Sequence, residues 1–242
     1  MIALLLSVGC HPVSGRPRMN PGCARAAELA LRAGGAVTAL HVGDPANPAL
    51  RDYLGLGLGA LTAFDAGRAV DALPVLIAEL ERLRPRIILC GDAAEVGEGS
   101  GMLPYLLGQA LGMLVLAGVI AIGDGSVLQS VSPTLQRRFA LDRPAVLIAS
   151  PGAPAARPVA FARARAGRID VVRVTGAPDP LDTDTEVKPA RRRPRRLRAE
   201  GPGAGSGGGG GGPALSGLSA DEAAVRIRDF LRANGILNGD AG

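Results

Sequence analysis

Short apolar runs alternate with segments of helical periodicity along the chain, up to about residue 150. Apolar runs of this length are typical of buried strands, and the segments between them are long enough for connecting helices. We therefore predict an α/β fold with a doubly wound, mostly parallel sheet of the Rossmann-like, adenine-nucleotide-binding type. The predicted strands are residues 2–8, 36–42, 61–64, 86–90, 144–150 and 169–174. The predicted helices are residues 47–59, 66–83 and 102–111, preceded by one that begins after Asn20.

The beginning of that first helix is a clear local signal. Asn20 is a good N-cap, because its side-chain oxygen can accept a hydrogen bond from an N–H of the first turn. Pro21 suits the first helical position, where a missing N–H costs nothing. Gly34 and Gly35 mark the end of the helix.

The pattern changes after residue 112. Residues 114–122, 127–131 and 135–141 have the composition of strands but no helical segments between them. The sequence Gly123-Asp124-Gly125 favours a tight turn between the first two. We expect an antiparallel excursion from the parallel sheet here.

The last third of the chain differs in composition. We predict a nucleotide-binding domain at residues 1–175, a flexible Arg/Gly/Pro-rich linker at 176–213 and a C-terminal arm at 214–242. A helix of the arm is expected to begin at Ser219, since acidic residues follow it. Its apolar stripe consists of Ala223, Ile227, Phe230 and Leu231. Such a helix needs a surface to cover, either on its own domain or on a partner, and we favour a partner.

The formal net charge is +5, and most of the excess lies in the Arg-rich run at residues 191–198. Proline interrupts this run, which favours a solvated tail or a protein-docking arm over a folded nucleic-acid-binding face. Aromatic residues make up 2% of the chain, so base stacking is scarcely available. We predict no nucleic-acid partner.

Cysteine and histidine usage argues for a cytoplasmic protein without a metal site. The chain has three cysteines, Cys10, Cys23 and Cys90, and two histidines, His11 and His41. Their positions show neither metal-ligand spacing nor a disulfide framework. The apolar start lacks a positively charged leader region, so it is interpreted as the first strand rather than an export signal. No apolar run approaches the ~20 residues of a membrane span, and no membrane insertion is expected.

The candidate site is the loop between the strand ending at Cys90 and the next helix. Gly99, Ser100 and Gly101 leave N–H groups unobstructed near a helix N-terminus, where a phosphate is favoured. Glu95 and Glu98 could accept hydrogen bonds from ribose hydroxyls. An ordinary tight turn is the alternative. Neither a Walker A motif nor G-x-G-x-x-G after the first strand is present, and no catalytic residues can be assembled.

Four segments resemble the β subunits of electron-transfer flavoproteins. The first is Met-Asn-Pro-Gly-Cys-Ala at 19–24, and the second is the strand, turn and helix at 87–112, ending in Leu-Leu-Gly-Gln-Ala-Leu-Gly. The third is Leu-Asp-Arg-Pro-Ala-Val at 141–146. The fourth is a basic stretch with Arg163, Arg165 and Arg168 before the last strand. Their order and spacing match the family over roughly residues 1–175.

The resemblance implies an electron carrier subunit rather than an enzyme in its own right. Its partner would be an α subunit that holds most of the FAD, while the β subunit supplies an adjoining wall and buries a structural AMP. The heterodimer would carry electrons from flavin dehydrogenases to a membrane quinone-linked acceptor, and the C-terminal arm would wrap the partner. The resemblance places cofactor-binding residues at Ser7, Val8, Gly9, Asn20, Pro21, Gly22, Cys23, Gly43, Gly91, Glu95, Glu98, Gly99, Ser100, Gly101 and Met102.

The chain also departs from the family pattern. The loop before Asn20 is short, so the hairpin usual there is expected to be missing. The glycine-rich loop is shortened around residues 95–98, which leaves AMP binding open. Residues 151–158 are rich in Ala and Pro where the family has a bulky recognition anchor, which implies a different redox partner or weaker docking. The alternative function is a stand-alone adenine-nucleotide-binding sensor or stress-type module.

Overall fold

A computed structural model describes residues 1–67, 70–97, 99–123, 125–178, 217–234 and 236. The chain divides into two units, Met1–Val187 and Lys188–Gly242, each described here by itself. The Arg-rich run at 191–198 and nearly all of the predicted linker lie outside the described residues.

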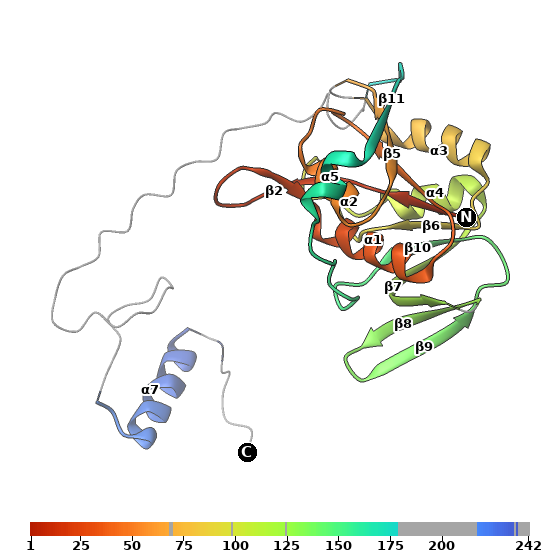
Figure 1. The fold of residues 1–242 in the computed structure, drawn as a ribbon. Coiled ribbons are helices and arrows are strands. Elements are labelled where there is room, and N and C mark those ends of the chain that lie inside the picture. The colour runs from red at the N-terminus through yellow and green to blue at the C-terminus, as the bar shows by residue number, and fades with distance from the viewer. Residues whose placement is uncertain (68–69, 98, 124, 179–216, 235, 237–242) are drawn as a thin grey trace. The chain divides into compact units, whose positions relative to one another are not determined.

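The first unit is built on a nine-stranded sheet with the order β11-β5-β4-β1-β6-β10-β7-β8-β9 (Figure 1). All neighbouring strands from β11 to β7 are parallel, and β8 and β9 are antiparallel additions at one edge. The predicted α/β class and the antiparallel excursion are confirmed. The strands are β1 (Ile2–Leu5), β4 (Val37–Val42), β5 (Ala60–Asp65), β6 (Ile87–Cys90), β7 (Leu114–Gly123), β8 (Ser126–Ser132), β9 (Leu135–Ala140), β10 (Ala145–Ala149) and β11 (Arg168–Arg173).

Helices cover the two faces of the parallel part, as expected for a doubly wound sheet. Helices α1 (Pro21–Ala33) and α2 (Ala49–Gly55) pack on one face, and α3 (Ala72–Leu83) and α4 (Leu103–Leu111) pack on the other. Side chains of a strand alternate between the faces, so Leu4 belongs to the first core cluster and Leu5 to the second.

The residues that cap the two ends of α1 are those predicted from the sequence. Asn20 is the N-cap, and its Oδ1 accepts a hydrogen bond from Cys23 N–H at 3.0 Å. Pro21 occupies the first helical position, and Gly34 ends the helix at φ +71°, in a region that L residues rarely adopt.

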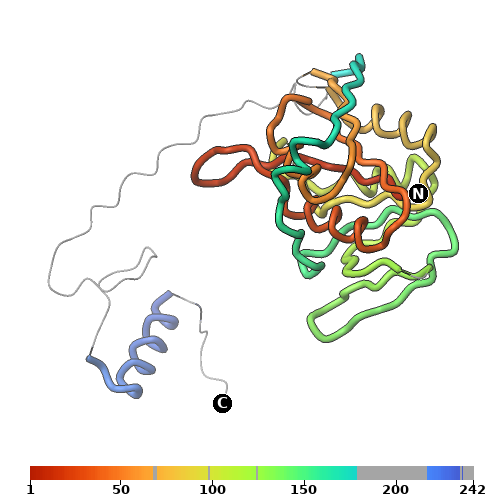
Figure 2. The backbone as a smooth tube through the Cα atoms, in the orientation of Figure 1, coloured from red at the N-terminus to blue at the C-terminus, as the bar shows by residue number. Residues whose placement is uncertain are grey.

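The expectation of a missing hairpin is wrong. Strands β2 (Val8–Cys10) and β3 (Pro17–Met19) form a short antiparallel pair that extends from the body of the unit (Figure 2). The short loop suffices because His11 Nδ1 accepts hydrogen bonds from the N–H groups of Val13 and Ser14, which tightens the turn. The predicted strand at residues 2–8 is accordingly two strands, with Leu6 and Ser7 between them.

One predicted helix begins later than expected, and one helix was not predicted. The helix expected from residue 66 begins at Ala72, because the side chain of Asp71 accepts the N–H of Leu73 and caps it there. Helix α5 (Phe161–Ala166) was not predicted, since it is six residues long and buries only Ala164. A helix that short carries too few periodic positions to be recognised.

The second unit contains α7 (Ala220–Ala233), close to the predicted position. Ser219 and Glu222 form a capping box, in which each side chain bonds the backbone of the other residue. No residue of α7 is buried, and Ile227 and Phe230 are 61% and 65% exposed. Among the helices that the structure describes, none is long and apolar enough to cross a bilayer.

Candidate functional site

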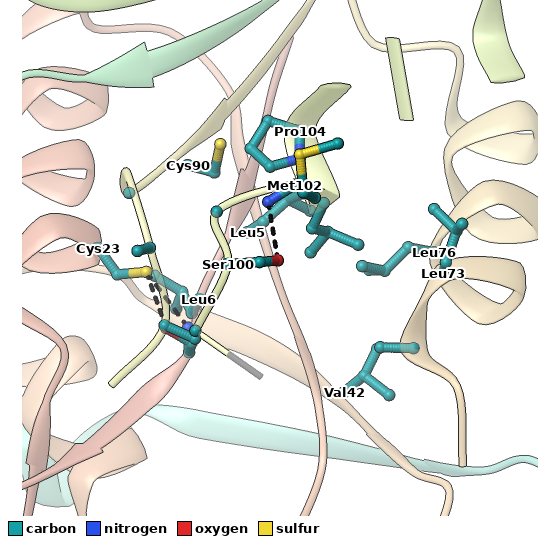
Figure 3. Close-up of a pocket in the computed structure, with 18 of the residues that line it drawn as sticks. Leu5, Leu6, Cys23, Val42, Leu73, Leu76, Cys90, Ser100, Met102 and Pro104 are labelled. Carbon is teal, nitrogen blue, oxygen red and sulfur yellow. Dashed lines mark hydrogen bonds between the residues drawn. The ribbon is translucent and has the colours of Figure 1, made fainter. Parts of the chain in front are cut away.

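A cavity of about 540 Å³ opens at the carboxyl ends of β1, β4 and β6 (Figure 3). The chain winds from β1 toward β4 and β5 on one side and begins the other side with β6. Ligands of open α/β sheets bind outside the carboxyl ends of the strands at such a switch point. The size also falls within the range of small-molecule sites.

Residues from six elements and their loops line this cavity. Those that the sequence singled out are Ser7, Cys23, Gly91, Gly99, Ser100, Gly101 and Met102. Those that it did not single out are Leu5, Leu6, Leu40, Val42, Asp71, Ala72, Leu73, Leu76, Cys90, Asp92, Ala93, Ala94, Val96, Leu103, Pro104 and Leu106. Most of the latter are apolar, so one end of the cavity is suited to a flat uncharged group.

Gly91 allows the loop after β6 to lie directly against the start of α1. A Cβ placed on Gly91 would lie 2.6 Å from Cys23 N and 2.7 Å from Gly22 C, closer than real Cβ atoms come to backbone. Gly22 is confined as well, because a Cβ there would collide with the Asp92 carboxylate and lie 3.2 Å from Asp92 N. The two glycines therefore define the wall between the helix start and the loop.

Asn20 ties the same two segments together. Its side chain accepts from Cys23 N–H within α1, and its Nδ2 donates to Ala93 O at 2.9 Å across the wall. The residue is 1% exposed, and these hydrogen bonds satisfy its amide. Asn20 thus holds the wall of the cavity rather than lining it.

Tyr53 of α2 also stabilises this wall of the cavity. Its hydroxyl donates to Ser7 O at 2.8 Å and accepts from Asn20 N–H at 3.0 Å. The side chain is fully buried, and burial raises the pKa of Tyr53 well above its usual value. The phenol therefore stays neutral and serves as a fixed link between the ends of β1 and β3.

Replacing Tyr53 with phenylalanine is expected to lower the free energy of unfolding by about 2 kcal/mol, because buried Ser7 O and Asn20 N–H lose a partner. Urea denaturation of the full chain measures this effect. Tyr105→Phe is the matched control, since Tyr105 is 46% exposed, and it should change stability by less than about 0.5 kcal/mol. Equal effects of the two changes would contradict the role of the Tyr53 hydroxyl.

Two buried thiols flank the cavity. Cys23 Sγ lies 3.2 Å from Ser7 Oγ, and Cys90 Sγ donates weakly to Leu147 O at 3.7 Å. Burial raises the pKa of the Cys90 thiol far above its ordinary value, so it packs as a small apolar group. Cys23 is 5% exposed and packs in the first turn of α1.

The glycine-rich loop turns through three described residues with left-handed backbone, Gly97 at φ +82°, Gly99 at φ +65° and Gly101 at φ +70°. Ser100 is not the N-cap of α4. That position belongs to Met102, and Ser100 Oγ accepts the N–H of Met102 at 3.2 Å. The hydroxyl of Ser100 thus stabilises the loop while facing the cavity (Figure 3).

Glu95 does not face the cavity, contrary to a ribose-binding role in this conformation. Its carboxylate forms an ion pair with Arg18 of β3, in which Arg18 Nε donates to Oε2 at 3.1 Å. Gly9 makes room for this pair, since a Cβ on it would collide with Glu95. Glu98 lies outside the described residues.

The remaining predicted residues lie around the cavity but outside its lining. Val8 packs against the first core cluster, and Pro21 opens α1. Gly43 sits at φ +148° beside His41, whose Nδ1 donates to Leu6 O at 2.9 Å. Burial lowers the pKa of His41, and its Nε2 has no partner among the described residues.

The lining residues that the sequence did not reveal come from the ends of β1, β4 and β6, from the loop after β6, and from the starts of α3 and α4. Val42 carried a usable signal, because it ends a strand at the edge where ligands bind. Asp71 and Leu73 carried none, since their approach to the glycine-rich loop depends on how α3 packs beside α4. In the described part of the chain, no three His, Cys, Asp or Glu side chains are placed to hold a metal ion.

Comparison with known proteins agrees with the family resemblance seen in the sequence. A model of the electron transfer flavoprotein domain matches residues 14–177. Over 178 residues the chain is 35% identical to the electron transfer flavoprotein subunit beta of Chromohalobacter salexigens, covering 70% of this chain and 67% of that protein. The chain belongs to the electron transfer flavoprotein β-subunit family.

The resemblance seen in four short segments is therefore confirmed. As a member of this family, the chain has the electron-transfer role of a β subunit and is associated with flavin. The matched residues include α1, the glycine-rich loop and most of the cavity lining, but not β1, β2 or Ser7 between them. The family match also ends before α7.

Proposed function

We propose that this chain is the β subunit of a heterodimeric electron-transfer flavoprotein whose α subunit holds most of the FAD. The heterodimer would carry electrons from flavin dehydrogenases to a quinone-linked respiratory acceptor. The observation that carries the proposal is the family match over residues 14–177. The flavin would supply the redox chemistry, while this chain contributes a wall of the flavin site and fixes the partner's orientation.

The proposal is tested by co-expressing the chain with an α subunit of the same organism and purifying the complex. We expect a stable one-to-one complex with the absorbance bands of bound flavin. A complex without those bands, or a chain that ignores the α subunit and assembles only with itself, would contradict the proposal. The second result would favour the alternative of a stand-alone nucleotide-binding module.

We also propose that the cavity holds an adenine nucleotide that supports the structure. The residues fit such a group in three respects. The loop has no side chains at three positions, Gly91, Gly99 and Gly101. The apolar end of the cavity can receive a base, and the Asp92 carboxylate can accept hydrogen bonds from ribose hydroxyls. Ser7 and Cys23 close the end nearest β1.

The proposed role of α7 is to dock on the α subunit. Its apolar stripe is exposed, and a single amphipathic helix is stabilised mainly by the surface that it covers. Truncation before Ala214 is expected to weaken assembly with the α subunit at least tenfold while leaving the first unit folded, as measured by calorimetric titration and circular dichroism.

Single substitutions refine this test. Phe230→Ser removes the largest side chain of the stripe, whereas Asp229→Ser changes the opposite side of the same helix. The first change should weaken assembly and the second should not. If both changes and the truncation leave the affinity for the α subunit unchanged, α7 does not contribute to the heterodimer.

A further inference from the structure

The segment between β10 and α5 is held against α1 by side chains of that helix. Arg25 donates a hydrogen bond to Ala153 O. The Glu28 carboxylate, which is buried, accepts hydrogen bonds from the backbone N–H and the guanidinium of Arg157, the latter at 2.8 Å. Two positions of the segment are therefore fixed relative to the body of the first unit.

The end of the same segment packs on α2. Ala160 N–H donates to Gly55 O at 3.0 Å. A Cβ placed on Gly55 would collide with Val159 Cγ1, so the missing side chain is what lets Val159 lie against the helix. The backbone that enters α5 is thus fixed immediately before Phe161, the first residue of that helix.

Phe161 extends from this fixed backbone into solvent. It is 78% exposed, the highest exposure of the aromatic side chains that the structure describes. Aromatic residues are enriched at the centres of protein–protein interfaces. An aromatic side chain on a backbone that is already ordered loses less conformational entropy on binding than one on a mobile loop. Phe161 therefore has the properties of an anchor for a partner.

The surface around Phe161 is basic. Helices α2 and α5 lie side by side (Figure 1) and together carry three cations and one carboxylate, namely Arg51, Arg163, Arg165 and Asp52. Within the described part of the chain, the side chains of Arg163 and Arg165 have no ion-pair partner, whereas Arg168 pairs with Asp170. Arg165 lies one turn beyond Phe161, on the same side of α5. This face is therefore complementary to an apolar recess bordered by carboxylates.

The small size of the apolar patch indicates a transient partner. Val159 and Phe161 are the large apolar side chains exposed on this face, whereas permanent subunit interfaces are larger and more hydrophobic. Charged groups around a small apolar centre mainly raise the rate of association, which suits a carrier that binds and releases its partner in every cycle. Phe161 also closely follows residues 151–158, the Ala/Pro-rich segment without a bulky side chain.

We propose, on the basis of the function proposed above, that Phe161 is the anchor by which this chain docks on an electron-donating flavin dehydrogenase. Phe161 enters an apolar recess of the dehydrogenase, and Arg163 and Arg165 face carboxylates at the rim of that recess. The docking residues therefore lie on α5, beyond residues 151–158. The contacts of the preceding segment with α1 and α2 hold Phe161 in place for this role.

The test is electron transfer from a flavin dehydrogenase of the same organism to the flavin-loaded α–β complex. The reduced flavin of the dehydrogenase is oxidised as the flavin of the complex is reduced, and the rate is measured against the concentration of the complex. Phe161→Ala is expected to raise the KM for the complex about tenfold and to change kcat less than about twofold, because docking alone is altered. An unchanged KM would overturn the proposal.

Phe139→Ala is the matched control. Phe139 is 37% exposed on β9, which lies at the opposite edge of the sheet from β11, the strand after α5. The same chemical change there should leave the KM unchanged, and an equal rise in both variants would contradict a specific role of Phe161.

The arginines are tested by charge and by salt. Arg165→Gln should raise the KM about threefold, since one of the attractive charges is removed. For the unmodified complex the KM should rise between about 20 mM and about 200 mM salt, because salt screens the attraction to an acidic surface. A KM that stays constant or falls as salt rises would show that the partner surface is not acidic, and the proposal would be wrong.

The failure of the proposed function itself would look different. If no flavin dehydrogenase of the organism reduces the unmodified complex, the proposed function and the docking role of Phe161 are both wrong. If Phe161→Ala instead lowers the flavin content or releases the α subunit, Phe161 belongs to the heterodimer interface. If only electron transfer to the quinone-linked acceptor slows, the acceptor docks on this face. In both of these cases the heterodimer stands and the proposal for Phe161 is overturned.

Discussion

Replacing Gly91 with alanine is expected to lower the free energy of unfolding by about 3 kcal/mol and to abolish ligand binding in the cavity. The added Cβ would lie 2.6 Å from Cys23 N and 2.7 Å from Gly22 C. Both atoms belong to the backbone at the start of α1, which cannot move aside as a flexible side chain would. Either the loop after β6 or α1 must shift, and each shift opens the wall of the cavity.

The matched control is Gly59→Ala. Gly59 has no heavy atom within 4 Å of the added Cβ and no positive φ, so the change should be neutral or slightly stabilising. Urea denaturation of both variants gives the stability difference, and titration of the α–β complex gives ligand binding. A Gly91→Ala variant as stable as Gly59→Ala would show that the loop does not lie against α1.

The parallel part of the fold could be predicted because its strands are buried on both faces. Residues 86–90 were expected as a strand and residues 87–90 form one, since a continuous apolar run leaves little ambiguity. The N-cap at Asn20 was equally visible in the sequence. The hairpin and α5 were missed because each has few residues and little burial, so tertiary contacts rather than local pattern decide them.

The candidate site was only partly accessible from sequence. The glycine-rich loop stands out by composition, and the structure places Gly91, Gly99 and Gly101 at the cavity. The Arg18–Glu95 pair could not be foreseen, because the two residues are separated by 77 positions and meet through the hairpin. Side-chain partners of this kind depend on strand order and on loop geometry, neither of which the pattern specifies.

A second ion pair that the sequence did not predict gives the other large expected effect on the free energy of unfolding. Glu28 of α1 is 3% exposed and accepts hydrogen bonds from Arg157, 129 positions away, and from Arg32. Arg157 N–H also donates to it, so the carboxylate holds the segment after β10 against α1. The Arg157 side chain is the largest cause that holds the pKa of Glu28 at about 2.

The direction of the resulting pH dependence follows from that low pKa. In the unfolded chain Glu28 titrates near its ordinary value of about 4.3, so on acidification the unfolded state takes up the proton first. The stabilisation is fully present above about pH 5 and is lost as the pH falls toward 2. It amounts to about 3 kcal/mol, because each tenfold difference in proton affinity is worth about 1.4 kcal/mol.

Glu28→Gln is therefore expected to lower the free energy of unfolding at pH 7 by about 3 kcal/mol. At pH 2–3 the free energies of unfolding of the variant and the parent chain should differ much less, because the parent has then lost most of the stabilisation by ionised Glu28. Urea denaturation at several pH values measures both. Glu79→Gln makes the same chemical change in an i,i+3 pair of α3 whose arginine, Arg82, is 68% exposed, and it should cost less than about 1 kcal/mol at every pH. A loss in Glu28→Gln that is equal at pH 7 and at low pH would show that packing, not the charge of Glu28, secures the segment after β10.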